Sequence, residues 1–279
     1  MDTFFYRRTD NGFVPCDLTI GPWSSRYQHG SPPFALGSMV AVSQFPGLNL
    51  SHATISFVRP VSLDPISIRF LESRHTRRTA WSAYSIVQNG NDVAFGTVSL
   101  ADAPNGAISL PDSLPTVPDR LVRLASCHWE SPGPPLGCDA SGNQLPWINH
   151  PCGFMQSSHW KFPNGAFSSA GPGEAWWMTE ASLIEGEDTP SWLLPLLLSD
   201  ANWSISRRFS LEDMSAVNTG ISCTLVSDPD SRELGLSSAN YWSSERNGIS
   251  LGHIYDRHKL VATVAQPLLL STPRAHPVA

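Results

Sequence analysis

Hydrophobic and polar residues alternate along two stretches of the chain, and each stretch contains one segment that is apolar on nearly all sides. In the first stretch this segment is Phe34 to Val42, which follows Gly30-Ser31-Pro32, a sequence typical of a helix start. A helix that is apolar all round is expected to be buried. Segments that alternate with period two, as half-buried strands do, are 52–58, 65–72, 80–87 and 93–100. Gln88-Asn89-Gly90-Asn91 predicts a tight hairpin turn before the last of them.

The same pattern returns after residue 175. The apolar segment is here W-L-L-P-L-L-L-S-D, residues 192–200, which predicts a buried helix ending near Ile205. Alternating segments around it are 176–184, 217–226, 233–243, 248–255 and 260–270. Strand, buried helix and antiparallel meander therefore occur twice, which predicts an internal structural repeat.

Between the two stretches, prolines and glycines are dense and no period is visible. A connection this long is uncommon inside one compact domain. We therefore predict an N-terminal domain of residues 1–117, a Pro/Gly-rich connector of residues 118–172 and a C-terminal domain of residues 173–279. Each domain is of the α+β class, an antiparallel sheet around one apolar helix.

The amino-acid composition excludes some classes of function. Of 279 residues, 41% are hydrophobic and 15% are charged, and the formal net charge is −6. This balance argues against a nucleic-acid or anionic-membrane binder, which would present a basic face. No apolar run reaches membrane length, the first residues do not resemble a signal peptide, and the five cysteines are an odd number. We expect a cytoplasmic protein with reduced thiols and no stable membrane insertion.

Two local motifs are set aside. Gly248 to Gly252 fits G-x-S-x-G, but a nucleophile elbow needs a helix directly after it, and this segment reads as a strand. Cysteines and histidines of the connector, which are Cys127, His128, Cys138, His150, Cys152 and His159, lack the paired spacing of a zinc site. We therefore predict no metal and no cofactor.

Motifs in both halves resemble those of the acyl-CoA thioesterase II family and its thioesterase-like relatives, which have a tandem, or double, hotdog fold. The motifs are G-P-W-S-S-R-Y-Q-H-G-S-P-P-F-A-L (21–36), H-A-T-I-S-F-V-R-P-V (52–61), I-S-I-R-F-L-E-S-R-H-T-R-R-T-A-W-S-A-Y-S-I-V-Q-N-G-N-D-V-A-F (66–95), L-L-L-S-D (196–200) and V-A-T-V-A-Q-P-L-L-L (261–270). They cover about residues 12–101 and 175–271, but not the connector. The resemblance implies one chain that acts as a fused hotdog dimer, with homo-oligomers possible.

The resemblance also implies site residues. In the family an aspartate, a glutamine and a threonine or serine hold the water that attacks the thioester carbonyl; the first two match Asp200 and Gln266. Asp200 would act as general base, Gln266 would fix the water, and backbone N–H groups at a helix start would hold the oxyanion. The third position departs from the family pattern. Its hydroxyl is either Thr219, one place off, or missing, and Asn218 stands where the family has an aspartate.

Four further residues are substrate-side candidates, each with a structural alternative. His29 and Gly30 open the first helix, where a role in helix entry is the alternative. His52 lies on an alternating strand, where histidines are more often half-buried and satisfied. Trp192 is either core or an aromatic wall for an acyl chain. The hairpin tip at residues 74–78 is either a solvated turn or a contact for coenzyme A phosphates.

Three functions remain open. The first is hydrolysis of an acyl thioester, with coenzyme A or a carrier protein as the thiol. The second is a non-hydrolytic enzyme, a dehydratase or cyclase for an acyl or polyketide-like substrate, in which Asp200 works with a histidine. The third is an acyl-binding module without catalysis. On its own, Asp200 could also merely cap the turn that follows it.

Overall fold

The fold was determined from a computed structural model of the 279-residue chain. The structure describes residues 3–102, 117–119, 121–122, 150, 152–164, 167, 171, 173–207, 215–243 and 247–271. In chain order the strands are β1 (Phe4–Thr9), β2 (Gly12–Pro15), β3 (Asn49–Phe57), β4 (Ser67–His75), β5 (Thr79–Gln88), β6 (Asn91–Ala101), β7 (Ser158–Asn164), β8 (Gly173–Thr179), β9 (Ser182–Ile184), β10 (Ser215–Asn218), β11 (Gly220–Leu225), β12 (Leu234–Trp242), β13 (Asn247–Tyr255) and β14 (Leu260–Ser271).

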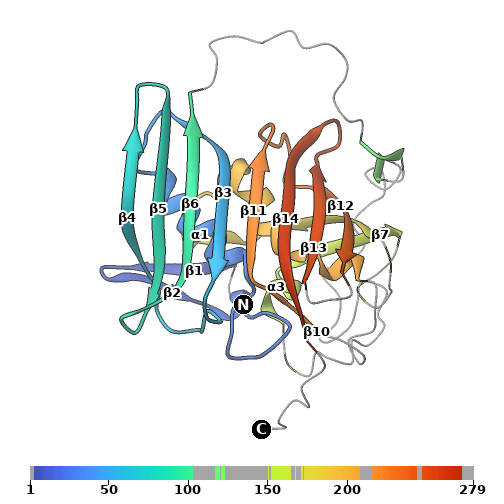
Figure 1. Cartoon of the computed structure of the whole chain (residues 1–279), viewed down its shortest axis with the longest axis horizontal. Helices are drawn as coiled ribbons and strands as arrows, with labels where there is room; N and C mark the ends of the chain where they lie inside the picture. The colour runs from blue at the N-terminus through green and yellow to red at the C-terminus, as the bar shows by residue number, and fades with distance from the viewer. Residues whose placement is uncertain are drawn as a thin grey trace.

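One large antiparallel sheet runs through both halves of the chain (Figure 1). The strand order of the first half recurs in the second half, counted from the opposite side of the sheet toward its centre. The order is β4-β5-β6-β3-β11-β14-β13-β12-β8-β7, with β10 paired to β14. Thus β4-β5-β6-β3 in the first half corresponds to β12-β13-β14-β11 in the second. The halves join where β3 pairs with β11, from Ser56 opposite Gly220 to His52 opposite Thr224. The predicted repeat is therefore present, and its two halves form one continuous sheet.

The first predicted helix is present as α1 (Ser31–Val42), which is buried along most of its length. Two proline residues occupy its first turn, where a missing N–H costs least. Farther along, Gly37 and Gly96 leave room for the ring of Tyr84, which a Cβ at either position would meet within 2.4 Å. The Tyr84 hydroxyl lies 3.3 Å from Ser38 Oγ, and burial raises the pKa of Tyr84. The helix therefore sits directly on the sheet.

The second predicted helix is shorter than the apolar run suggests. The α-helical part, α4, spans Leu194–Leu198, and 3₁₀ turns flank it at Ser191–Leu193 and Ser199–Ala201. Pro195 lacks an N–H and cannot bond the preceding turn. The hydroxyl of Ser199 also donates to the Pro195 carbonyl (2.7 Å), which competes with regular helical bonding. The expected continuous helix to Ile205 is therefore a chain of short turns, and Asp200 lies in one of them.

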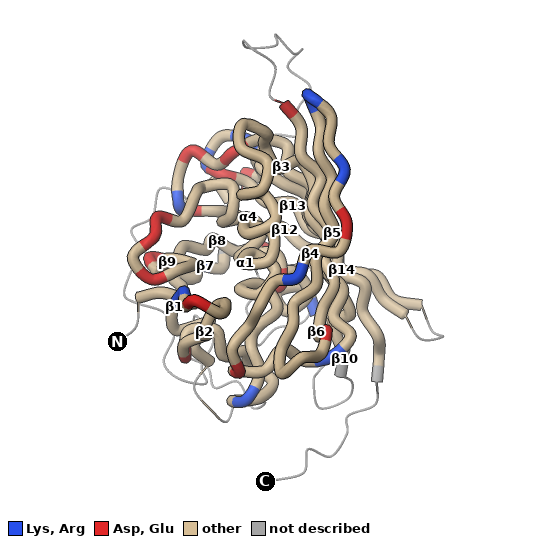
Figure 2. The backbone as a smooth tube through the Cα atoms, turned by 90° about the vertical axis from the view of Figure 1, so that its left-hand side faces the viewer, with Lys and Arg blue, Asp and Glu red and all other residues tan. Residues whose placement is uncertain are grey.

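Both helices lie between the large sheet and a second layer made of β2, β1 and β9 (Figure 2). β1 pairs with β2 antiparallel and with β9, from the other half, in parallel. The resulting core is continuous across the halves, with Phe34 and Leu36 of α1 and Leu196 and Leu197 of α4 in one cluster. This arrangement brings the start of α1 against the end of α4.

Most strand predictions are confirmed, including the hairpin at 88–91, but two predicted strands are each divided. Residues 176–184 fall in β8 and β9, which belong to different sheets, and residues 217–226 fall in β10 and β11. Asn89 and Gly90 both have positive φ, 51° and 76°, as a tight primed turn requires. The G-x-S-x-G segment lies in β13 with Ser250 buried, so it is not a nucleophile elbow. The predicted domain boundaries stay a prediction; β7, which falls within the predicted connector, extends the sheet by pairing with β8.

Candidate active site

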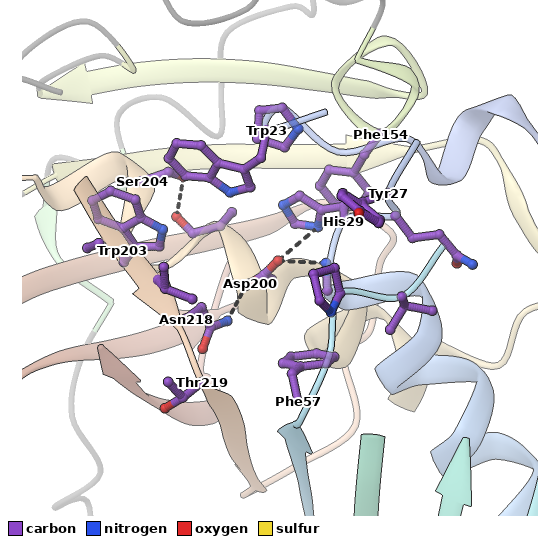
Figure 3. A pocket seen from close by; sticks show the side chains of 18 of the residues that line it. Trp23, Tyr27, His29, Phe57, Phe154, Asp200, Trp203, Ser204, Asn218 and Thr219 are labelled. Carbon is purple, nitrogen blue, oxygen red and sulfur yellow. Dashed lines mark hydrogen bonds and ion pairs between the residues drawn. The ribbon is translucent and has the colours of Figure 1, made fainter. Parts of the chain in front are cut away.

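A cavity of about 440 Å³ lies where the two halves meet, at the start of α1 and beyond the end of α4 (Figure 3). Its walls come from the loop before α1, the end of β3, the short helix α3 (Gly153–Gln156), β7, the turns after α4, and β10. Aromatic rings that line it are Trp23, Tyr27, Phe57, Phe154, Trp160, Phe167 and Trp203. Among the described lining residues Asp200 is the sole carboxylate.

Backbone bonds fix the loop that carries His29 and Gly30. The N–H of His29 donates to the Thr19 carbonyl (2.7 Å), and the N–H of Gln28 donates to the Val61 carbonyl (2.8 Å). Gln28 is also held through its side chain by the Tyr6 hydroxyl (2.6 Å). His29 therefore enters the cavity at a set position, with its ring stacked on Phe154 at a centroid distance of 3.9 Å.

The Asp200 carboxylate receives donors from both halves of the chain. Its Oδ2 accepts the Gly30 N–H (2.8 Å) and lies 3.3 Å from His29 Nδ1. Its Oδ1 accepts the side-chain amides of Gln266 (2.9 Å) and Asn218 (2.5 Å). In return, the Asp200 N–H donates to Ser31 Oγ (3.1 Å). The carboxylate is 12% exposed, and it does not cap its own turn.

Gln266 lies behind Asp200 rather than in the cavity wall. Its side chain is fully buried, and its carbonyl oxygen accepts the Trp203 N–H (2.9 Å) while its amide nitrogen faces Asp200. Both ends of the amide are therefore engaged by protein. Gln266 orients Asp200 in this structure, and the contact to water that the family resemblance implies stays a prediction.

Asn218 and Thr219, the two candidates for the third position, have different environments. The Oδ1 atom of Asn218 accepts the Gly220 N–H (2.9 Å), which turns its amide nitrogen toward Asp200. Thr219 lies between β10 and β11, and its hydroxyl lies 3.3 Å from the Pro267 carbonyl, which accepts from it. Both residues line the cavity, but only Asn218 contacts Asp200.

The structure does not bring His52 or Trp192 into the cavity wall. His52 lies on β3, where its Nδ1 is 2.9 Å from the hydroxyl of Thr224 in the neighbouring strand. Trp192 lies in the turn before α4 and packs against the main core cluster. Both positions match the structural alternatives that the sequence left open.

Sequence reasoning missed several cavity residues. Trp23 and Trp203, one from each half, stack with ring centroids 5.9 Å apart; the first was part of a motif but carried no role. Phe154 comes from the connector, where no period could place it. Arg207 is buried at the cavity, where its guanidinium donates to the carbonyls of Phe167 and Ser204. Desolvation lowers the pKa of Arg207 to about 10, so it remains cationic near neutral pH.

The start of α1 offers few free donors for an oxyanion. Pro32 and Pro33 have no N–H, and the Gly30 N–H is already bound to Asp200. The Ser31 N–H lies 3.4 Å from His29 Nδ1. A substrate oxygen that binds here must therefore compete with Asp200 or His29 for a donor.

No group of three or more His, Cys, Asp or Glu residues that could hold a metal ion occurs within the described ranges. Cys127, His128 and Cys138, which were considered above as zinc ligands, lie outside those ranges. In the described part of the chain, no helix has the length and hydrophobicity needed to cross a membrane.

The burial of His29 predicts how the stability of the protein depends on pH. Desolvation lowers the pKa of His29 below its usual 6.5, and the nearby Asp200 charge offsets this in part. The unfolded chain therefore binds more protons than the native one below about pH 6.5, so stability is full above that pH and is lost as the pH falls. Between about pH 7.5 and about pH 5, we expect His29→Gln to lose less thermal stability than wild type. The measurement is the melting temperature of both proteins at each pH. His253→Gln, an exposed histidine on β13, is the control; equal acid sensitivity of wild type and His29→Gln would contradict the assignment.

Solved structures with this fold cover nearly the whole chain. A hotdog-fold protein of unknown function from Alicyclobacillus acidocaldarius is 15% identical, with a TM-score of 0.68 over 98% of each chain. A tesB protein of Mycobacterium avium subs. paratuberculosis is 13% identical, with a TM-score of 0.66 over 96% of each chain. A putative thioesterase II from Thermobifida fusca is 16% identical, with a TM-score of 0.65 over 96% of each chain. No curated protein matches the chain.

These likenesses and the repeated strand order define the chain as a double-hotdog protein, so the predicted fold is confirmed. Residues 19–101 match the family model of the acyl-CoA thioesterase N-terminal domain. The resemblance to the acyl-CoA thioesterases that the motifs indicated is thereby confirmed: residues 19–101 are similar to that domain, and the chain as a whole shares its fold with a tesB protein.

Proposed function

We propose that the chain hydrolyses acyl thioesters at the cavity between its two halves. The observation that carries the proposal is the position of Asp200: a single carboxylate among the described lining residues of an aromatic cavity, held by donors from both halves. An apolar cavity with a few convergent polar groups is typical of a small-molecule site.

In the proposed reaction, Asp200 takes a proton from a water molecule as the water oxygen attacks the thioester carbonyl carbon. The C–S bond then breaks, the acyl group leaves as a carboxylic acid, and the proton passes to the departing thiolate. Asp200 already has four close polar contacts, so the water must replace one of them. The contact to His29 Nδ1, at 3.3 Å, is the longest of the four, and His29 also lines the cavity.

The test is thiol release from a panel of acyl-CoAs of different chain length, run in ¹⁸O-labelled water. Attack by water places one ¹⁸O atom in the carboxylic acid, which mass spectrometry detects. Absence of thiol release above background from every acyl thioester would overturn the proposal.

Asn218, rather than Thr219, is proposed as the third member of the site. Asn218→Asp keeps the shape but removes the donor to Asp200 and places a second carboxylate beside it, and two such groups resist joint ionisation. We expect the kcat for thiol release to fall by about tenfold or more at neutral pH. Thr219→Val, which removes only the hydroxyl near the Pro267 carbonyl, should stay within about twofold of wild type. The opposite order of the two variants would assign the third position to Thr219.

A second function is favoured by the approach of His29 Nδ1 to Asp200. If Nδ1 carries the proton, it donates to Asp200 and no longer accepts from the Ser31 N–H. The other ring nitrogen is then left as a base, since it has no hydrogen-bond partner among the described residues. A 3-hydroxyacyl thioester could then lose its α-proton to His29 and its hydroxyl, protonated by an acid form of Asp200, as water. Mass spectrometry distinguishes the two reactions, because dehydration removes 18 mass units, the mass of one water, and leaves the thioester intact.

A further inference from the structure

Arg59 lies at the rim of the cavity, two residues beyond the end of β3. Its backbone N–H donates to the Val93 carbonyl (3.1 Å), so the main chain is held while the side chain is exposed. The other formally charged residues of the cavity wall are Asp200 and the buried Arg207. The rim of the cavity therefore carries a cation although the chain as a whole has a net charge of −6.

Among the described residues, no carboxylate lies within ion-pair distance of the Arg59 guanidinium. Most other exposed arginines of the described ranges are paired: Arg7 with Glu185, Arg8 with Glu187, Arg69 with Asp92, Arg74 with Glu72 and Arg257 with Glu233. A guanidinium without an internal partner at the mouth of a site is available to an anionic group of a ligand, and its planar donors suit phosphate.

Apolar side chains surround the same mouth. Trp23, Val58 and Val217 line the cavity and are 46%, 58% and 52% exposed. Large apolar side chains that are exposed together are typical of a surface that a ligand covers. The rim thus offers contact area for an uncharged chain and, at Arg59, one positive charge.

The β4–β5 hairpin tip, which the sequence suggested for phosphate contact, lies at the other end of the sheet (Figure 1). The strand register places Thr79, next to the tip, opposite Ala101, which in turn is opposite Asn49 at the start of β3. Phe57, at the cavity end of β3, is eight positions away, which is roughly 26 Å along a strand. The arginines of the hairpin tip are therefore remote from the cavity mouth.

We propose that the cavity rim binds the phosphorylated pantetheine arm of the thiol carrier, with Arg59 pairing with its phosphate and Trp23, Val58 and Val217 covering the uncharged part. This inference rests on the thioesterase function proposed above. Coenzyme A and a carrier protein present the same arm, so the recognised chemistry is common to both.

The experiment compares three substrates with the same acyl group: acyl-pantetheine, acyl-4′-phosphopantetheine and acyl-CoA. Wild type should prefer the phosphorylated substrates, and Arg59→Gln should reduce that preference in kcat/KM by about three- to tenfold, the scale of one charge-assisted contact at an exposed site. Added salt should weaken the preference in wild type more than in the variant. Arg78→Gln, at the hairpin tip, is the matched control and should keep the wild-type preference.

An equal effect of Arg59→Gln on all three substrates, or none on any, would overturn the proposal. If wild type hydrolyses no thioester, the proposed function fails, and binding of 4′-phosphopantetheine against pantetheine by calorimetry then tests the rim by itself. Binding that needs the phosphate and Arg59 would support the proposal, and equal binding of the two compounds or no binding would reject it. A preference for acyl-CoA over an acylated carrier protein, or the reverse, identifies the source of the arm.

Discussion

Asp200→Asn is expected to reduce the kcat for thiol release by about 100-fold or more, which corresponds to about 2.7 kcal/mol of transition-state stabilisation. The amide has the shape of the carboxylate but cannot take a proton from water. Its NH₂ group would also face a donor on one side or the other, because Gly30, Asn218 and Gln266 all donate to Asp200. The measurement is steady-state thiol release from the best acyl-CoA.

Loss of those hydrogen bonds also changes stability. The melting temperature of Asp200→Asn must therefore be measured together with its kcat. Asp92→Asn is the matched control: it breaks the ion pair with Arg69 on the sheet and should leave kcat unchanged. Binding of a non-hydrolysable acyl-CoA thioether should persist in Asp200→Asn, since the aromatic walls are intact. Wild-type turnover in a folded Asp200→Asn variant would show that another group activates the water.

The repeated fold could be predicted from the sequence because its signals are local. The period-two strands, the helix that begins at Ser31 and the turn at Asn89-Gly90 depend on residues that are neighbours in the chain. The second helix is shorter than the sequence predicts, because the spacing of apolar residues carries no information on the hydrogen bond that Pro195 cannot make.

The site could be predicted only in part, because it is made by contacts between distant segments. Asp200 and Gln266 were found through motifs, and the structure brings them within 2.9 Å. That Gln266 is buried behind the carboxylate depends on the register of β14, which no motif encodes. Phe154 stacks on His29 from a connector without period, so no signal in the sequence placed it there.

Gly30→Ala is expected to lower the kcat for thiol release by about 10- to 100-fold, more than any loss of stability accounts for. Gly30 has φ −67°, which any residue adopts, so alanine brings no backbone strain. A Cβ at this position would lie 2.8 Å from Asp200 Oδ2 and 3.1 Å from Phe57 Cζ. The carboxylate must therefore shift by a fraction of an ångström to about 1 Å, and displacements of that size cost up to about 100-fold in catalysis.

Gly235→Ala is the control for crowding alone, because its Cβ would meet Leu121 Cδ1 at 3.2 Å in the core, away from Asp200. It should keep its kcat even where it melts lower than wild type, whereas Gly30→Ala should lose far more kcat than its change in melting temperature accounts for. A Gly30→Ala variant with full kcat would mean that the position of the carboxylate does not limit the reaction. The close approach of Gly30 to Asp200 would then be a packing contact between the two halves, and His29 would become the stronger candidate for the base.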